Sequence, residues 1–220
     1  EYVKVLDEVR TGNAIIQNDK SGDNCILLYG GANQAITREQ VDEVMAHFEK
    51  GDYIVLQNEI NELAYIMEKA HEKGLVTVLN PSPMNEKIST LPLDTVNYFL
   101  LNEVEASQIL GKETTGDETW EVIAGQLLER FPHASIVLTM GSEGSVFKNH
   151  KETVIQPIYK VQAVDTTAAG DTFTGYFIGG ILSGLSAKEA MDQAAKASAI
   201  AVTRRGAAPS IPVLSEVQAC

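Results

Sequence analysis

The stretch V-D-T-T-A-A-G-D-T-F-T-G-Y, residues 164–176, joins a predicted strand to a predicted helix of small residues and places Asp171 at the entrance of that helix. The residues just before Asp171 are small, so the backbone can approach a ligand closely. The first amide groups of a helix have no acceptor within it, and the helix N-terminus carries roughly half a unit of positive charge. Residues 166–171 therefore favour the binding of a phosphate group.

Asp171 has two interpretations at this position. As a base, its carboxylate can take the proton from a substrate hydroxyl while neighbouring N–H groups hold the phosphate that the hydroxyl attacks. As a structural residue, an acid in the first turn stabilises a helix through the helix dipole alone. The residues of this stretch are compatible with both interpretations.

Composition limits the classes of partner. The chain has 220 residues, of which 44% are hydrophobic, so it can bury a sizeable core and requires no more than one main domain. The net charge of -13 argues against nucleic acid and against an anionic membrane surface as partners, because both bind basic patches. The charge does not argue against a phosphate site that is made of backbone amides.

The cysteines and the first residues of the chain indicate in which cellular compartment the protein is expected. Cys25 and Cys220 are far apart and show no spacing typical of a disulfide framework or a zinc site, so we expect a cytoplasmic protein. No apolar run approaches the roughly eighteen residues that span a bilayer, and residues 1–4 show no signal-peptide pattern. The chain does not begin with Met, and we therefore expect it to start inside a longer protein.

The first part of the chain predicts a hairpin and a helix. Residues 11–18 and 25–29 are short β-type runs joined by a polar segment, which is the pattern of a β-hairpin. Thr37, with Gln40 three residues later, predicts a capping box for a helix that ends near residue 51.

From residue 53 onward, predicted strands and helices alternate. We expect strands at residues 53–57, 75–79, 97–101, 136–140, 145–148, 153–156 and 161–164, and helices at 62–73, beyond 102, at 118–130 with Asp117 as its cap, at 173–183 and from 186 to about 204. This alternation predicts an α/β sandwich with a mainly parallel sheet, in which ligand sites lie at the carboxyl ends of the strands.

Two motifs at predicted strand ends have a structural as well as a functional interpretation. Asn102 and Glu105 have the spacing of a helix N-cap and its N3 partner, so capping explains them without a ligand. Residues 139–144, T-M-G-S-E-G, contain two glycines that allow a tight turn and a close backbone approach, but a simple hairpin turn would look the same. The chain has neither a Walker A motif nor a G-x-G-x-x-G fingerprint, which disfavours P-loop and Rossmann enzymes.

Two more segments have a structural interpretation that needs no ligand. In residues 201–210, Arg204, Gly206 and Pro209 follow one another in the order of a helix stop, which is the structural interpretation. Glu59, which follows the predicted strand 53–57, is on its own an ordinary surface acid.

The string D-T-T-A-A-G-D, residues 165–171, with Thr172, Phe173 and Gly175 after it, resembles the C-terminal signature of the ribokinase-like carbohydrate kinases, the PfkB family. The resemblance implies a three-layer α/β/α sandwich with a mainly parallel sheet and a small β lid hairpin. It also implies ATP-dependent phosphorylation of a primary hydroxyl of a sugar, with Mg²⁺ and K⁺ as cofactors.

The same resemblance assigns roles to residues. Asp171 is the general base and also contacts the substrate, as does Glu59, and Glu105 acts indirectly on magnesium. The backbone anion hole consists of Ala168, Ala169 and Gly170. ATP binding falls to Asn102, Thr139, Gly141, Ser142, Glu143, Gly144 and Gly170. The potassium site consists of Asp165, Thr167, Ala201, Arg204, Gly206 and Ser210.

The resemblance covers nearly all of the chain but not the first part of the family's pattern. We therefore expect residues 1–220 to be an N-terminally truncated kinase domain, with a partial β lid at about 9–33 and an α/β nucleotide-binding core at 34–220. In the family the lid covers the sugar and often pairs two subunits, so a homodimer through the lid is expected. Two alternatives remain: a kinase of another alcohol, such as a nucleoside, a sugar phosphate or a vitamin precursor, and a catalytically silent sugar-binding relative.

Overall fold

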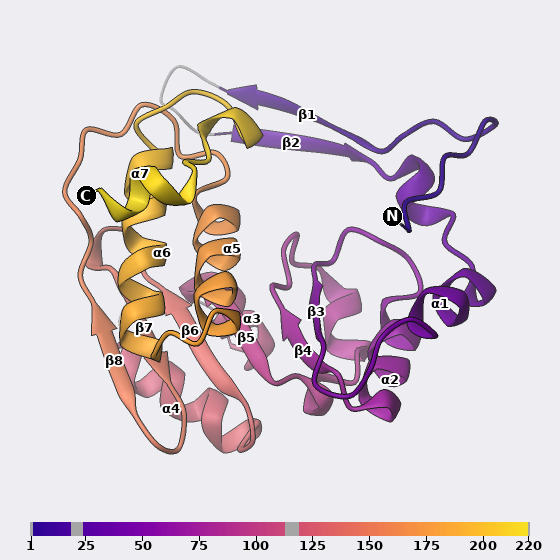
Figure 1. The fold of residues 1–220 in the computed structure, drawn as a ribbon, viewed down its shortest axis with the longest axis horizontal. Coiled ribbons are helices and arrows are strands. Elements are labelled where there is room, and N and C mark those ends of the chain that lie inside the picture. Colours follow the sequence, from indigo (N-terminus) through magenta and orange to yellow (C-terminus); the bar gives the residue numbers. More distant parts are fainter. Residues whose placement is uncertain (1, 19–23, 113–118, 220) are drawn as a thin grey trace. The chain divides into compact units, whose positions relative to one another are not determined.

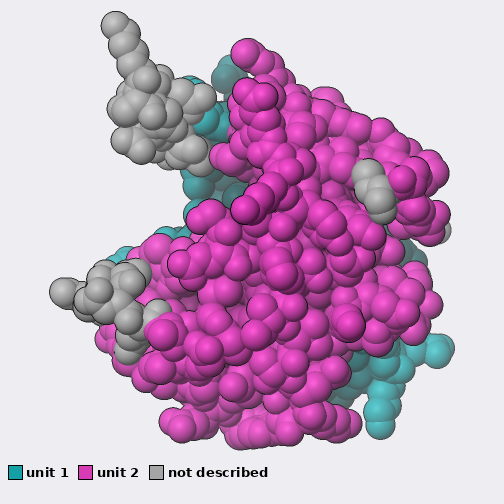
Figure 2. Space-filling model, turned by 90° about the vertical axis from the view of Figure 1, so that its left-hand side faces the viewer, with its two compact units in different colours: residues 1–96 teal, residues 97–220 magenta. Residues whose placement is uncertain are grey.

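The computed structural model describes residues 2–18, 24–112 and 119–219 (Figure 1). The chain divides into two compact units, residues 1–96 and residues 97–220, which Figure 2 shows in different colours. None of the helices in the described ranges is long and apolar enough to cross a membrane.

The first unit begins with the predicted hairpin. Strands β1 (Asn13–Asn18) and β2 (Asn24–Tyr29) pair antiparallel, with Asn13 opposite Tyr29 (Figure 1). Consecutive strand residues face opposite sides of a two-stranded ribbon, and apolar side chains are exposed on both sides. The exposed apolar residues of the hairpin are Ile15, Ile16, Leu27, Leu28 and Tyr29.

The rest of the first unit alternates helices and strands. In chain order its elements are η1 (Gly31–Gln34), α1 (Arg38–Met45), β3 (Tyr53–Leu56), α2 (Leu63–Lys73), β4 (Val76–Leu79), η2 (Glu86–Thr90) and η3 (Leu93–Thr95), where η marks a 3₁₀ helix. Strands β3 and β4 are parallel, and α2 connects them. Helix α2 ends at Gly74, whose φ of 73° is the left-handed conformation expected of a C-terminal glycine. These elements confirm the predicted strand–helix–strand order.

Helix α1 is shorter than predicted. It begins at the Thr37 N-cap, where the Thr37 side chain accepts a hydrogen bond from Gln40 N, but it ends at Met45 rather than near residue 51. The ammonium group of Lys73, at the end of α2, donates to the carbonyl groups of Met45 and Phe48. These carbonyls belong to the end of α1 and the turn after it, so a contact from a distant helix helps to stop α1 early.

The second unit contains a four-stranded sheet segment and most of the helices. In chain order its elements are β5 (Tyr98–Asn102), α3 (Glu103–Ile109), α4 (Trp120–Arg130), β6 (Ser135–Thr139), η4 (Gly141–Glu143), β7 (Ser145–Lys148), β8 (Thr153–Gln156), α5 (Ala169–Leu182), α6 (Ala187–Ala201), η5 (Ala208–Ser210) and α7 (Leu214–Gln218). Strands β5 and β6 are parallel, and β7 and β8 continue the sheet antiparallel. The structure begins α4 after Thr119, and the predicted cap Asp117 lies outside the described residues.

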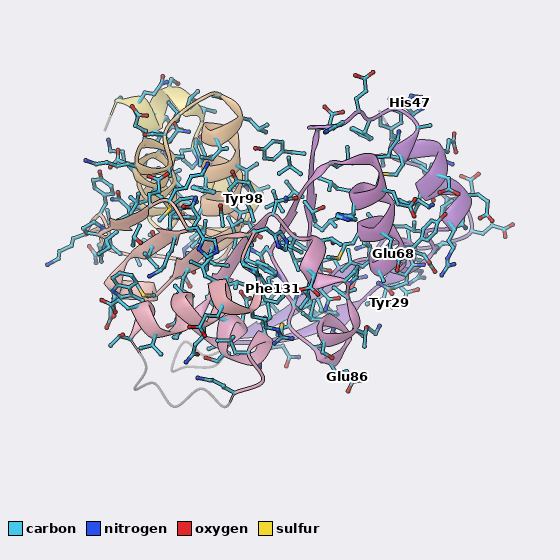
Figure 3. The ribbon with its side chains drawn as sticks, turned by 90° about the horizontal axis from the view of Figure 1, so that it is seen from below. Tyr29, His47, Glu68, Glu86, Tyr98 and Phe131 are labelled. Atoms are coloured by element: carbon cyan, nitrogen blue, oxygen red, sulfur yellow. The ribbon has the colours of Figure 1, made fainter. Side chains whose placement is uncertain are left out.

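Aromatic rings form the centre of this unit. Phe99 of β5 packs against Phe131 with ring centroids 4.7 Å apart, and both side chains are almost completely buried. Tyr98, the neighbour of Phe99 on β5, meets Phe177 of α5 edge to face at 6.4 Å. Tyr98 and Phe131 are labelled in Figure 3. Side chains from the start of β5 thus contact α5 and the residue that follows α4.

The predicted strand at residues 161–164 is wrong. The structure gives no strand between Gln156 and α5, and the side chains of Val161 and Val164 are exposed. A strand needs a partner strand for its backbone groups, and here the backbone turns to a helix instead: Val164 N and Asp165 N both donate to Val202 O, at 2.7 and 3.1 Å. The signature loop is therefore held at its start by the end of α6.

Helices α5 and α6 lie side by side (Figure 1). The buried face of α6 consists of alanines and Met191, and a Cβ at Gly180 of α5 would lie 3.1 Å from the Ala190 Cβ. Small side chains let two helix backbones approach closely, which the packing of this pair requires. The buried alanines of α6 are Ala187, Ala190, Ala194, Ala197 and Ala201.

Candidate functional site

The signature loop enters α5 through a strained residue. Ala168, the N-cap of α5, has a φ of 59°, the left-handed region that a residue with a Cβ rarely adopts. No side chain caps this helix. The Ala168 carbonyl accepts hydrogen bonds from the Thr172 amide at 2.9 Å and the Thr172 hydroxyl at 2.8 Å. The protein thus maintains an unfavourable conformation at the point where the sequence predicts the anion hole.

Gly170 and Asp171 lie in the first turn of α5, and both are exposed. Amides in the first turn of a helix have no acceptor within the helix and point along its axis. A Cβ added at Gly170 would meet no atom within 4 Å, so the fold itself does not require a glycine there. The backbone at this turn is accessible to a ligand, and the Asp171 carboxylate is one residue away.

Asp165 joins the signature loop to the segment after α6. One carboxylate oxygen accepts from Thr167 N at 3.0 Å, and the other accepts from Gly206 N at 2.9 Å. A hydrogen bond from the Thr167 side chain, followed by the Gly206 and Thr167 amides, lowers the pKa of the Asp165 carboxyl to about 2. Three of the residues predicted for the potassium site, Asp165, Thr167 and Gly206, are therefore brought together.

The other predicted potassium residues have different partners. The guanidinium group of Arg204 forms an ion pair with Glu216 of α7 at 2.6 Å. The backbone amide of Arg204 donates to Ala201 O at 3.0 Å. Ser210 is completely buried, and its hydroxyl donates to Ala207 O at 2.7 Å. Helix α6 ends at Ala201, three residues earlier than predicted, so residues 202–207 form a loop between α6 and the 3₁₀ helix η5.

Asn102 and Thr139 lie next to each other at the carboxyl ends of β5 and β6. They are register partners in the parallel pair, and the Thr139 hydroxyl donates to Leu101 O at 3.2 Å. The family resemblance assigns both residues to ATP through separate motifs, and the sheet register explains how they can act at one place. Ligand sites of parallel sheets lie at this edge.

The capping interpretation of Asn102 and Glu105 is confirmed. Asn102 Oδ1 accepts from Glu105 N at 2.8 Å, and Glu105 Oε2 accepts from Asn102 N at 3.0 Å. The Glu105 side chain is buried, and burial raises the pKa of its carboxyl. The hydrogen bond from the Asn102 amide acts in the opposite direction and only partly offsets this rise. Because a carboxylate has two oxygens, capping through one of them is compatible with a second partner at the other.

The two glycines of the β6–β7 turn have different reasons to be glycine. Both have a positive φ, 50° at Gly141 and 103° at Gly144. A Cβ at Gly144 would lie 2.3 Å from Gln156 O, so this glycine is required by the sheet itself. A Cβ at Gly141 would meet no atom within 4 Å. Gly141, Ser142 and Glu143 form an exposed turn, which leaves this backbone accessible to a ligand.

Glu59 belongs to the first unit, where it follows β3 in an exposed loop. Its carbonyl accepts from Gln34 Nε2 at 3.0 Å, and the side chain of Asn61 pairs with the backbone of Ile36 through two hydrogen bonds of 3.0 and 2.7 Å. The loop that carries Glu59 is thus attached to the segment that follows the hairpin. Neither Gln34 nor Asn61 was identified from the sequence, since side-chain bonds to a remote backbone leave no pattern.

Ser198 was also missed. Its hydroxyl donates to Ala169 O at 2.8 Å, which joins α6 to the first turn of α5. The only sequence signal is weak: Ser198 is a polar residue in an alanine-rich helix, next to Ala197 and one turn from Ala194 and Ala201, which are completely buried.

Comparison with known proteins agrees with this geometry. Residues 1–214 match the model of the pfkB family carbohydrate kinases. The ribokinase of Staphylococcus aureus is 35% identical over 219 residues, which are 98% of this chain and 71% of the relative. The ribokinase of Schizosaccharomyces pombe is 35% identical over 227 residues, which cover 99% of this chain and 70% of the relative.

Solved structures give the same result for the fold. The Cryptococcus neoformans ribokinase in complex with ADP matches with a TM-score of 0.85 and 28% identity, over 99% of this chain and 73% of that one. The Arabidopsis thaliana ribokinase complexed with ribose and ATP matches with a TM-score of 0.79 and 27% identity, over 98% and 72%. The predicted three-layer α/β/α class with a mainly parallel sheet is confirmed. With a family match over nearly the whole sequence and a signature loop at the entrance of α5, the chain belongs to the pfkB family of carbohydrate kinases.

Proposed function

We propose that the chain transfers the γ-phosphoryl group of ATP to a primary hydroxyl of a sugar, with Asp171 as the general base. The observation that carries this proposal is the first turn of α5, which places an exposed carboxylate beside backbone amides that have no acceptor within the helix. The family match and the ribokinase relatives support the sugar and the nucleotide.

In this mechanism Asp171 accepts the proton of the attacking hydroxyl, which makes the oxygen a stronger nucleophile. The amides of Ala168, Ala169 and Gly170 form the anion hole for the transferring phosphoryl group, helped by the positive end of the α5 dipole. Most of the catalysis in phosphoryl transfer comes from positioning and electrostatic stabilisation, and a rigid helix turn supplies both.

The nucleotide is proposed to lie over the two strand ends and the adjacent turn. Asn102 and Thr139 are neighbours at this edge, and the η4 turn offers the exposed backbone of Gly141, Ser142 and Glu143, while Gly144 keeps the turn tight. Open space above Gly141 allows a phosphate or ribose to approach the backbone closely.

Two ions belong to the proposal. Glu105 fits an indirect role with magnesium, because its carboxylate is a hard oxygen ligand and only one of its oxygens is used by the cap. Bound magnesium would neutralise charge on the transferring phosphates. Potassium fits the segment where Asp165 joins Thr167 to Gly206, with oxygens from Ala201, Arg204 and Ser210 nearby in sequence. Replacing K⁺ with Na⁺ at constant ionic strength should lower the rate; equal rates would remove potassium from the proposal.

The remaining parts of the proposal concern the substrate side and assembly. Glu59 is proposed to contact the sugar, and the hairpin at β1 and β2 to act as a lid that pairs two copies of the chain in the cytoplasm. The exposed apolar residues on both sides of the hairpin support a covered surface. Sedimentation of the wild type and of Leu27→Glu tests the pairing: a monomer in both samples would contradict it.

The direct test is an assay of ADP release with a panel of acceptors. Ribose should be the best acceptor, followed by deoxyribose, with hexoses and inosine much weaker. Asp171→Asn should lower kcat by roughly 10²- to 10⁴-fold with little change in the Kd for ADP. A preference for inosine would favour the alternative alcohol kinase, and full kcat in Asp171→Asn would remove Asp171 from the mechanism. ADP binding without turnover of any acceptor would favour the silent sugar-binding relative.

A further inference from the structure

The signature loop is positioned by helix α6 rather than by the sheet. The residues before it, 157–164, form no strand, so no ladder of backbone hydrogen bonds from a neighbouring strand fixes the start of the loop. Instead, Val202 O accepts from Val164 N and Asp165 N, at 2.7 and 3.1 Å, and Gly206 N donates to Asp165 Oδ2 at 2.9 Å. These contacts all come from the last turn of α6 or from the segment just beyond it.

The other end of the loop is attached to the same helix. Ser198 lies one turn before Val202 on α6, and its hydroxyl donates to Ala169 O at 2.8 Å. Ala169 is the first residue of α5 and immediately precedes Gly170 and Asp171. The loop between Asp165 and Ala169 is therefore held at both ends by a single turn of α6.

The contact depends on close packing of the two helices. A serine side chain is short, so its oxygen can reach a backbone carbonyl of another helix only where small residues line the interface. Gly180 opposite Ala190 provides this approach further along the pair. Gln193 Nε2 and Tyr176 O, at 3.5 Å, form a second contact of the same kind between α6 and α5. The order of these contacts shows that α6 runs antiparallel to α5 and reaches the N-terminus of α5 at Ser198.

We infer that Ser198 is a positioning residue for phosphoryl transfer: its hydrogen bond to Ala169 O fixes the first turn of α5, and with it the anion hole and Asp171, relative to the loop at Asp165. The inference rests on the proposed function, in which these groups carry the reaction. Helix α5 has no side-chain cap of its own, and Ala168 is strained. The first turn would therefore fray easily, and an external hydrogen bond has a correspondingly large influence on its position.

The experiment compares three variants of the full chain. Ser198→Ala removes the hydroxyl and replaces it with a residue of higher helix propensity, so the helix should form normally. Ser198→Thr keeps a hydroxyl at the same carbon. Gln193→Ala is the matched control, because it removes another side-chain bond from α6 to the α5 backbone, at Tyr176 O, about two turns of α5 beyond Ala169.

Steady-state kinetics should distinguish a loss of catalytic positioning in the variants from a general loss of stability. Ser198→Ala should lower kcat by about 3- to 30-fold with the KM for ATP nearly unchanged, because misplacement of reacting groups affects the transition state more than ground-state binding. Ser198→Thr should regain most of the rate, and Gln193→Ala should keep the wild-type kcat. A wild-type kcat in Ser198→Ala, or an equal loss in Gln193→Ala, would overturn the inference.

A second measurement does not depend on activity. In the helix, Ala169 O accepts from the Phe173 amide, so freeing the first turn should speed hydrogen exchange of that amide by about tenfold in Ser198→Ala and not in Gln193→Ala. Unchanged exchange would show that Ser198 does not position the turn. If the wild type phosphorylates no sugar, the proposed function fails, and the exchange rates alone decide whether Ser198 holds the turn.

Discussion

Helices α3 and α5 belong to the same unit, but their N-termini differ in what meets the first amides. At α3, Asn102 and Glu105 exchange two hydrogen bonds, so the helix end is satisfied by its own side chains. At α5, the N-cap is Ala168, and no side chain caps the helix. The Ala169 amide donates to Thr166 O at 3.2 Å, but no side chain occupies the end of α5. Because the N-terminus of a helix attracts anions, this difference favours α5 as the proposed anion site.

Apart from loss of Asp171, the largest effect should come from filling the open space beside Gly170 in the first turn of α5. Gly170→Ala adds a Cβ that meets no protein atom within 4 Å, so the variant should be as stable as the wild type or up to about 1 kcal/mol more stable. Sugar phosphorylation should fall about 10- to 100-fold in kcat/KM, because the methyl group occupies the space where the phosphate approaches the backbone.

Gly179→Ala is the matched control for this prediction. Gly179 lies on the same helix, is exposed, and also has no atom within 4 Å of an added Cβ. Its replacement should stabilise the helix similarly and leave kcat/KM unchanged. If Gly170→Ala and Gly179→Ala have the same activity, the open space at α5 is not a ligand site, and the contrast with α3 loses its functional meaning.

The next largest effect should come from the capping box of α3. Asn102→Ala removes the acceptor of Glu105 N and should lower the free energy of unfolding by about 1 kcal/mol, as loss of an N-cap does. Urea denaturation measures this, with Gln108→Ala, an exposed residue of the same helix, as the control. An unchanged midpoint in Asn102→Ala would mean that α3 does not depend on its capping box.

A smaller effect is expected at Asp165, because solvent still screens a half-buried carboxylate. Its pKa is lowered in the folded chain from 3.8 to about 2, so its hydrogen bonds stabilise the fold above the unfolded pKa. The stabilisation should be lost as the pH falls from 3.8 towards 2. Denaturation midpoints of the wild type and Asp165→Asn, measured across this range, should converge at the acid end; a constant difference would contradict the hydrogen-bond account.

The smallest effect should come from the N-cap of α5. Ala168→Gly relieves a left-handed conformation that costs an alanine roughly 1–2 kcal/mol, but glycine loses roughly 0.5–1 kcal/mol more backbone entropy on folding. The net change should be a stabilisation of about 0.5 kcal/mol with activity kept. Thermal denaturation measures it, and a clear destabilisation would show that the Ala168 methyl group makes contacts that matter.

The sequence predicted the structural features that depend on residues close together in the chain. Capping at Thr37 and at Asn102 is a local pattern, and the structure confirms both caps. The wrong predictions involve distant partners. Helix α1 stops early with the help of Lys73 from α2, and residues 161–164 have no neighbouring strand because their amides turn to Val202.

The candidate site shows the same difference between features that the residues themselves indicate and features that depend on distant contacts. The resemblance named Asp165, Thr167 and Gly206, and the structure brings them together. Whether these residues hold potassium, and whether Asp171 is the base, stays a prediction. Ser198 and the left-handed Ala168 could not be predicted, because one acts across a helix interface and the other depends on backbone geometry that alanine does not favour.

The contacts that position the signature loop have a consequence for synthesis of the chain. The groups that hold residues 164–169 come from Ser198, Val202 and Gly206, which all lie later in the sequence. A ribosome delivers the N-terminal part first, so a nascent chain that ends before residue 198 already contains the whole signature but none of its supports. The site is therefore assembled only after residues 198–206 have been synthesised, when the strands β5 to β8 are already present in the nascent chain.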